Sequence, residues 1–411
     1  MANLTDDSLA AGMARRAVAA RARLAAFQAG TARRYLEHAA LKASLELFEP
    51  GAFVPWVSYL FPPEILASYG LTPLIPEVGA ATLTGTEFQG DVEAAVNRLP
   101  LSRDLCSYHR AALASLEAKL LPRPSICLGT TPLCLGKECL LDGLAQRLDV
   151  PFREIHVPLP PDEGPADDDA VAAVAAQLRA VHAELGRLTG RHSRLDRAIA
   201  YSNRAACAWR TIVARRLNGE LVLNGRQTFA FTFLGQIVWG TEAGAKGFEK
   251  LLSERGRRDL LLPGSNGGRP PRLRLLWLHT VPHHDTTLFD LIAQRDAAVV
   301  FEEMGQVHID LLDPADPFPG LARRLIEHPL WGSATRRARL VAALVHHARI
   351  DGVIHFNHWG CRHGAGTLPV LRDVLSREGI PFLALDGDAL DQPGAGREKA
   401  AGQLESFLEM L

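Results

Sequence analysis

The feature that most constrains this fold is the alternation of short apolar runs with helical segments. The run SICLG (125–129) leads through a turn into a helical segment and then into an extended segment ending near HVPLP (156–160). Four later apolar runs are likewise separated by helical segments: LRLLWLHTV, AAVVFEEM, DGVIHFNH and PFLALDGD. This rhythm is typical of parallel sheets covered by helices. It predicts an α/β fold with two doubly wound parallel-sheet units of Rossmann or flavodoxin type.

The length of 411 residues and the shifts in composition divide the chain into four expected regions. Residues 1–48 are rich in Ala, Arg and Leu and are expected to form an N-terminal helical segment. A first α/β domain is expected over 49–165, a helical middle region over 166–262 and a second α/β domain over 263–411. The clearest boundary is the Gly- and Pro-rich stretch LLPGSNGGRPPR (261–272).

Charge and apolar content exclude several classes of protein. Lys and Arg (45) nearly balance Asp and Glu (46), so we expect no nucleic-acid partner. No run of 18 apolar residues occurs, so we expect no transmembrane helix and no membrane partner. The polar, acidic start MANLTDDSLAAGMARR does not resemble a secretory signal, which favours a cytoplasmic location.

The segment GTTPLCLGKE (129–138) has the composition of a phosphate-binding loop but the wrong spacing. Six residues separate Gly129 from Gly136 where such a loop has four, and Glu138 replaces the hydroxyl that binds magnesium. The dinucleotide fingerprint G-x-G-x-x-G follows no predicted strand. The sequence therefore indicates no nucleotide site of either type.

Three of the six cysteines are expected in loops. Cys134 lies in a strand-to-helix loop, Cys361 follows the run DGVIHFNHWG in the second unit, and Cys106 lies in a loop that enters a helix. Loops at the carboxyl ends of parallel strands collect ligands, so these thiols could converge between the two units. Thiolates suit soft metals, either iron or zinc.

The other cysteines are expected to pack in the core because free cysteine is among the most buried residue types. This applies to Cys127 in an apolar run, to Cys139 near a helix start and to Cys207 within a helix. Cys139 is also the rival to Cys134 as a ligand. The histidines of HFNHWGCRH could form a zinc site with Cys361, but no second tight Cys/His cluster completes a tetrahedron.

Several segments, in this order, resemble the 2-hydroxyacyl-CoA dehydratase / benzoyl-CoA reductase family. They are LPLSRDLCSYHR (99–110), TTPLCLGKE (130–138), the long stretch from Asp351 to Asp391 and GQLESFLEML (402–411). The resemblance runs from about residue 50 to the C-terminus, and HWGCR followed by GIPFLALDGD is its most specific part. The last segment departs from the family pattern, since it is shortened and lacks the usual Thr-Arg pair.

The resemblance implies that Cys106, Cys134 and Cys361 hold one [4Fe–4S] cluster with one iron free of protein ligands. It implies one-electron reduction of an acyl-CoA thioester with loss of a hydroxyl as water. Reduction of an aromatic acyl-CoA and electron relay without a substrate site are the alternatives. Expected partners are a related second subunit, in a heterodimer or homodimer, and a separate ATP-hydrolysing iron–sulfur activator.

Two residues indicate that this chain is the substrate-holding subunit. Ser58 and Glu77 resemble the serine and glutamate that lie near the thioester and the cluster in such subunits. A carboxylate such as Glu77 could shuttle a proton or bind the leaving hydroxyl. A capping hydroxyl for Ser58 and a solvated charge at a strand end for Glu77 are the structural alternatives.

Overall fold

The computed structural model describes most of the chain. The described residues are 31–84, 86, 88–221, 223, 225–254, 271–283, 287–306, 309–390 and 394–411, with residues 12, 15, 16, 18, 19, 21 and 22. The expected boundary at 261–272 lies almost wholly outside them, as does most of the N-terminal segment before residue 31. The four-region division therefore stays a prediction.

The first sheet is parallel and has three strands in the order β1-β2-β3. They are β1 (Pro55–Val57), β2 (Ile126–Thr130) and β3 (Phe152–Ile155). Every residue of β2 is buried, because it is the central strand and helices cover both of its faces.

Helices cover both faces of the first sheet. On one face, α3 (Pro63–Ala67), α8 (Asp168–Thr189) and α13 (Phe318–Ile326) share a core with the strands. On the other lie α4 (Pro76–Thr84), α5 (Gln89–Arg98), α6 (Ser107–Glu117) and α7 (Leu135–Leu148). The core thus includes residues from α8 and α13, which follow the first α/β segment in the sequence.

The second sheet is also parallel, with strand order β5-β4-β6-β7. Its strands are β4 (Leu273–Leu278), β5 (Ala297–Glu302), β6 (Gly352–His358) and β7 (Phe382–Gly387). The chain passes from β4 to β5 on one side and returns to β6 on the other. Strand order therefore reverses between β4 and β6, and such a switch point opens a crevice at the carboxyl ends of the strands.

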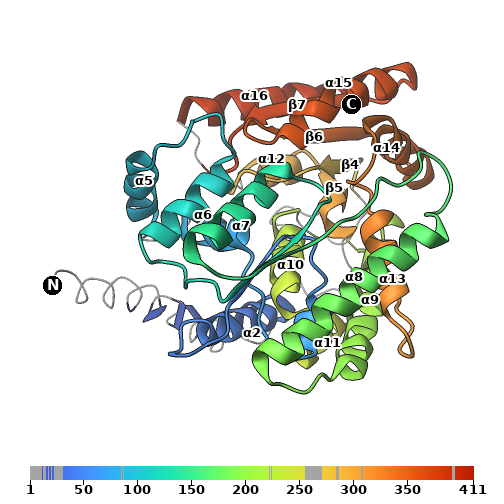
Figure 1. Ribbon diagram of the computed structural model, residues 1–411. Helices are drawn as coiled ribbons and strands as arrows, with labels where there is room; N and C mark the ends of the chain where they lie inside the picture. Colours follow the sequence, from blue (N-terminus) through green and yellow to red (C-terminus); the bar gives the residue numbers. More distant parts are fainter. Residues whose placement is uncertain are drawn as a thin grey trace.

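The second sheet is likewise sandwiched between helices. On one face lie α12 (Thr287–Gln294) and α16 (Gly394–Met410), and on the other lie α14 (Ala334–Ala348) and α15 (Arg362–Arg377). A short 3-10 helix, η2 (Glu303–Gln306), follows β5. In Figure 1 this sheet lies at the top of the molecule beside α15 and α16.

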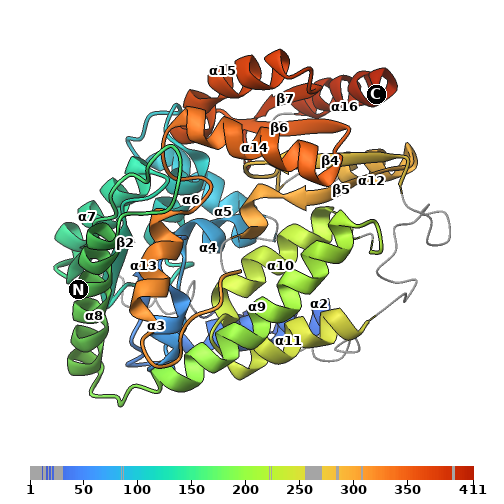
Figure 2. The same cartoon turned by 90° about the vertical axis from the view of Figure 1, so that its right-hand side faces the viewer.

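The remaining helices pack together in a separate cluster. They are α2 (Ala32–Glu46), α9 (Leu195–Leu217), α10 (Gly225–Val238) and α11 (Glu242–Ser253). Thr31 and Thr241 cap α2 and α11 by accepting backbone N–H groups, as their short hydroxyl side chains favour. Figure 2 shows these helices together below the second sheet.

These layers confirm the predicted α/β class with two parallel-sheet units and helices between them. The structural alternative of a strand-end charge for Glu77 was wrong. The segment after Gly70 makes only an isolated bridge between Leu74 and Trp56, and Glu77 lies in the first turn of helix α4, which begins at Pro76. In the described part of the chain, no helix is long and apolar enough to cross a membrane.

Candidate functional site

A cavity of about 390 Å³ lies where the carboxyl ends of β4 and β6 meet the loop after β2. Its wall includes residues from both units and is largely apolar, with Val78, Leu133, Phe233 and Leu330 among them. Three cysteines, five histidines, one glutamate and one lysine also face it. They are Cys106, Cys134, Cys361, His109, His279, His283, His358, His363, Glu77 and Lys137.

All three cysteines occupy the N-cap position of a helix. Cys106 precedes α6, Cys134 precedes α7 and Cys361 precedes α15. A helix N-terminus carries a partial positive charge and free N–H groups, both of which favour an anion. The Cys361 sulfur already accepts the Gly364 N–H at 3.3 Å. Three such ends directed at one cavity therefore suit a group with thiolate ligands.

The two units touch closely at Gly360. A Cβ added at this residue would lie 2.4 Å from the Cys106 Cα and 2.8 Å from its nitrogen, so only glycine fits. Beside this contact, the Tyr108 hydroxyl lies 2.8 Å from the Thr280 hydroxyl. These contacts bring helix α6 of the first unit against the carboxyl edge of the second sheet, and they bring Cys106 to Cys361.

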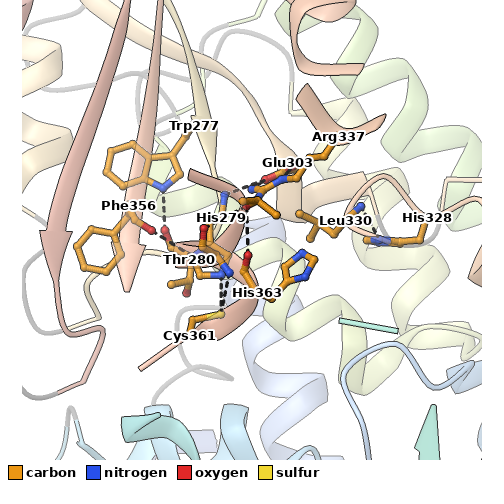
Figure 3. Close-up of polar contacts among 12 residues, drawn as sticks. Trp277, His279, Thr280, Glu303, His328, Leu330, Arg337, Phe356, Cys361 and His363 are labelled. Carbon is orange, nitrogen blue, oxygen red and sulfur yellow. Dashed lines mark hydrogen bonds and ion pairs between the residues drawn. The ribbon is translucent and has the colours of Figure 1, made fainter. Parts of the chain in front are cut away.

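Each cysteine sulfur has one imidazole beside it. The His358 Nε2 lies 3.3 Å from the Cys106 Sγ, and the His279 Nε2 lies 3.3 Å from the Cys361 Sγ. The His109 Nε2 is 4.0 Å from the Cys134 Sγ. Figure 3 shows the His279 ring directed at Cys361.

His109 also connects Cys134 with Glu77. Its Nε2 lies 3.7 Å from the Glu77 Oε1, while the buried Oε2 of Glu77 has no hydrogen-bond partner among the described residues. Burial alone would lower the pKa of His109. Its contacts with Cys134 and Glu77 outweigh burial and raise that pKa to about 10.

Lys137 is buried under the loop that carries Cys134. Its ammonium donates to the Thr130 carbonyl, to the Pro132 carbonyl at 2.6 Å and to the Thr130 hydroxyl at 3.4 Å. Leu133 in this loop has a positive φ of 84°, a conformation that is costly without such support. Burial lowers the pKa of Lys137 to about 8.

A buried ion pair supports the loop that carries Cys361. Arg337 donates to both carboxylate oxygens of Glu303 at 2.7 and 2.6 Å and to the Thr367 hydroxyl on α15 at 2.5 Å. Glu303 also accepts the backbone N–H of His279 at 3.0 Å. Figure 3 shows this network beside His279 and Cys361, so it fixes both members of that pair.

The structure places Ser58 outside the cavity wall. This residue is buried, and its hydroxyl lies 3.0 Å from the Thr130 hydroxyl, which Lys137 also contacts. Its neighbour Tyr59 lines the cavity instead. Glu77 and the three loop cysteines are therefore brought together, whereas Ser58 lies one layer behind them.

The other cysteines behave differently from one another. Cys127 is fully buried in β2, which confirms the packing prediction. For Cys139 and Cys207 that prediction was wrong, because both are exposed. Each lies on a helix face opposite the apolar stripe, and this position outweighs the general preference of cysteine for burial. The exposure of Cys139 also separates it from the cavity that Cys134 lines.

Sequence reasoning missed three residues of the site, namely His109, His279 and Lys137. His109 and Lys137 each follow a loop cysteine by three residues, which places them on the same helix face. His279 directly follows β4 at its carboxyl end. These spacings were available in the sequence, but their partners lie in other elements.

His355, the first histidine of HFNHWGCRH, does not line the cavity. The ring is fully buried in β6, stacked on His279 with centroids 5.5 Å apart, and neither nitrogen has a partner among the described residues. After β4, His283 lines the cavity, while residues 284–286 lie outside the described part of the chain.

Within the described residues, no group of three or more His, Cys, Asp or Glu side chains is arranged to hold a single metal ion. The three thiols instead lie around the wall of one cavity.

Comparisons with known proteins show what this chain is similar to. The profile of the family described as 2-hydroxyglutaryl-CoA dehydratase, D-component, matches residues 58–411. The alpha subunit of (R)-phenyllactyl-CoA dehydratase from Clostridium sporogenes is 24% identical over 90% of this chain and 92% of its own length. Subunit alpha of lactoyl-CoA dehydratase from Anaerotignum propionicum is 19% identical over 88% of this chain and 91% of its own length.

Proposed function

Because this chain belongs to the family of the 2-hydroxyglutaryl-CoA dehydratase D-component, we propose that it is the substrate-holding subunit of an ATP-activated 2-hydroxyacyl-CoA dehydratase. Both similar proteins named above are dehydratase alpha subunits, which favours dehydration over reduction of an aromatic ring. The observation that carries the proposal is the convergence of three N-cap thiols on one cavity.

Cys106, Cys134 and Cys361 would hold a [4Fe–4S] cluster. Their fit rests on the soft thiol donors, on the three helix N-termini and on glycines that leave room beside them. Burial raises the pKa of Cys106 and of Cys361, so binding must displace a proton from each thiol. When bound, the cluster supplies a low-potential electron and an open iron that can act as a Lewis acid.

Glu77 is the proposed proton carrier of the cavity. Its Oε2 is buried and unpartnered among the described residues, so it can accept a hydrogen bond from a substrate hydroxyl or take up a proton. His109 beside its Oε1 orients the carboxylate. Apolar wall residues such as Val78, Leu133 and Leu330 would exclude water from an acyl chain.

Ser58 enters the proposal as a positioning residue. Its hydroxyl contacts Thr130, and Thr130 in turn accepts from Lys137 below the Cys134 loop. Replacing Ser58 is therefore expected to act on substrate binding or on the cluster through this loop.

The proposed partners follow from the family. A related second subunit, identical or different, would complete the enzyme, as the alpha-subunit names of the two dehydratases imply for those proteins. The sequence contains no G-x-x-x-x-G-K-[ST] motif, so the ATP-hydrolysing iron–sulfur activator would be another polypeptide. We propose a reducing, cytoplasmic setting in anaerobic metabolism for all of them.

The first test is iron, acid-labile sulfide and zinc in anaerobically purified protein. We expect about four iron and four sulfide per chain, as one cubane requires. Cys134→Ala and Cys361→Ala should lose them, whereas Cys139→Ala is the matched control because Cys139 is exposed on the same helix as Lys137. Full cluster content in Cys134→Ala, or zinc in place of iron, would contradict the assignment.

The second test separates the reaction classes. With activator and partner subunit present, a 2-hydroxyacyl-CoA should lose water, and an aromatic acyl-CoA should not be reduced. Glu77→Gln should lower this activity while leaving iron content unchanged. If acyl-CoA leaves the cluster spectrum of the chain unchanged, the chain is a relay subunit and the substrate-holding role is wrong.

A further inference from the structure

Two imidazoles face two cluster cysteines with opposite hydrogen-bond polarity. His358 faces Cys106 and His279 faces Cys361, each through Nε2 at 3.3 Å from sulfur. The two contacts have equal length, but the second ring nitrogen of each histidine has a different kind of partner. In a neutral imidazole one nitrogen carries the proton, and the partner of the other nitrogen determines which.

His358 presents a proton to sulfur. The backbone N–H of Ala389 donates to its Nδ1 at 3.2 Å, so in the neutral ring Nδ1 holds the lone pair and Nε2 the hydrogen. The Gly387 carbonyl also acts on this ring and raises its pKa, against the larger opposite effect of burial. The nearest carboxylate, that of Asp388, is 3.8 Å from Nδ1, and its Oδ1 accepts the Leu390 N–H at 2.9 Å. At 3.8 Å it does not compete for the Nδ1 position.

His279 presents a lone pair to sulfur. Its Nδ1 lies 3.1 Å from the Phe356 carbonyl, which can only accept, so Nδ1 carries the hydrogen. The Nε2 that faces Cys361 is then without a proton in the neutral ring. The Phe356 carbonyl and the Cys361 contact are both drawn in Figure 3.

The surroundings hold the His358 ring in this orientation. The ring is buried at the end of β6, and Tyr108 packs edge-on against it with centroids 5.5 Å apart and planes at 86°. The Tyr108 hydroxyl is itself fixed by Thr280. The Ala389 N–H and the Tyr108 ring therefore hold the imidazole with its Nε2 directed at the Cys106 sulfur.

We propose that His358 donates an N–H···S hydrogen bond to Cys106 that raises the reduction potential of the bound cluster, while His279 does not. This rests on the proposed function. Reduction adds negative charge that is shared by the cysteine sulfurs, and a donor stabilises that charge, so the reduced state gains more than the oxidised one. His358 is thus a positioning residue that acts through a ligand.

The test compares two amides at position 358. His358→Asn keeps an acceptor near the Ala389 N–H but cannot reach the sulfur, whereas His358→Gln carries its N–H near the place of Nε2. We expect the cluster midpoint potential, measured by anaerobic redox titration with EPR, to become more negative in His358→Asn. His358→Gln should restore it wholly or in part.

His279→Gln and the wild-type protein complete the experiment. Replacing His279 removes no donor to sulfur, so it should not make the potential more negative. In D₂O, the wild-type cluster signal should show a deuteron coupling beyond that of the Gly364 N–H, which already donates to Cys361. His279→Gln should keep this extra coupling and His358→Leu should lose it, which decides the matter if His358→Asn fails to fold.

The outcomes separate the two proposals. An unchanged potential in His358→Asn with full iron content overturns the role of His358 and leaves the dehydratase function intact. An equal negative shift in His279→Gln, or a deuteron coupling in His358→Leu equal to that of the wild type, also overturns it. Failure of the wild-type chain to bind iron and sulfide overturns both.

Discussion

The two sheets carry a cysteine in the same topological place but support it by different means. Cys134 lies between β2 and α7, and Cys361 lies between β6 and α15. Beneath Cys134, Lys137 donates to neutral oxygens of Thr130 and Pro132. Beneath Cys361, Arg337 pairs with the carboxylate of Glu303. Equivalent topology therefore fixes where the thiol lies, whereas the rigidity of each loop depends on local chemistry.

The largest expected effect comes from breaking the ion pair of the second unit. Arg337→Met leaves Glu303 buried and charged without its partner, which should lower the free energy of unfolding by about 3–5 kcal/mol. Urea unfolding of the purified chain measures this. Arg339→Met is the matched control, because its pair with Glu163 is exposed and should contribute at most about 1 kcal/mol. If both changes lowered the free energy of unfolding equally, the buried Arg337–Glu303 pair would stabilise the fold no more than an exposed pair does.

A smaller loss is expected in the first unit. Lys137→Met removes the donor for the Thr130 and Pro132 carbonyls but leaves no buried charge behind. The free energy of unfolding should fall by about 1.5–3 kcal/mol. Iron content per chain should fall as well, because the Leu133–Cys134 turn loses its support. Retained iron at reduced stability would mean that the loop holds its shape without Lys137.

Glycines make a matched test across both units. A Cβ at Gly136 would lie 2.8 Å from the His109 Cε1, and one at Gly364 would lie 2.8 Å from the His279 Cε1. Gly136→Ala and Gly364→Ala should therefore each cost roughly 1–3 kcal/mol and displace the imidazole from its thiol. Gly143 and Gly366 lie in the same two helices with open space around them. Alanine there should stabilise by up to about 1 kcal/mol, as thermal unfolding can verify.

The smallest effect concerns acid sensitivity. Burial holds the pKa of His355 well below its ordinary value, so the unfolded state takes up a proton that the folded state does not. Stability is then fully present above about pH 6.5 and is lost as pH falls below it. His355→Leu should reduce the difference in unfolding free energy between pH 7.5 and pH 5. A difference equal to that of the wild type would assign the acid sensitivity to other groups.

The pKa values of the buried histidines also shift in opposite directions in the two units. Contacts with Cys134 and Glu77 raise the pKa of His109 in the first unit to about 10, although its burial opposes this. In the second unit, burial lowers the pKa of His328 to about 4, in the same direction as for His355. All three rings are buried, so burial alone cannot explain why the directions differ. The difference comes from the Cys134 and Glu77 partners of His109.

Much of the fold was predictable because strand and helix periodicity is local. The runs around Cys127, Trp277 and Ile354 became buried strands and the run around Leu385 a half-buried edge strand, and the expected parallel sheets formed from them. The predicted roles of Glu77, Ser58 and the three loop cysteines rest on the family resemblance and stay predictions. For Cys139 and Cys207 a residue-type preference was applied without regard to helix face, and it failed for that reason.

The sequence by itself determined the two strand–turn–helix units and the placement of Cys134 and Cys361 after buried strands, because hydrophobic patterning acts between near neighbours. Only the tertiary structure decided that Cys106 joins them through the contact at Gly360. It alone also decided that each thiol faces an imidazole and that the two closest imidazoles differ in polarity. These relations join residues far apart in the chain, so they depend on how the two sheets dock and not on any local pattern.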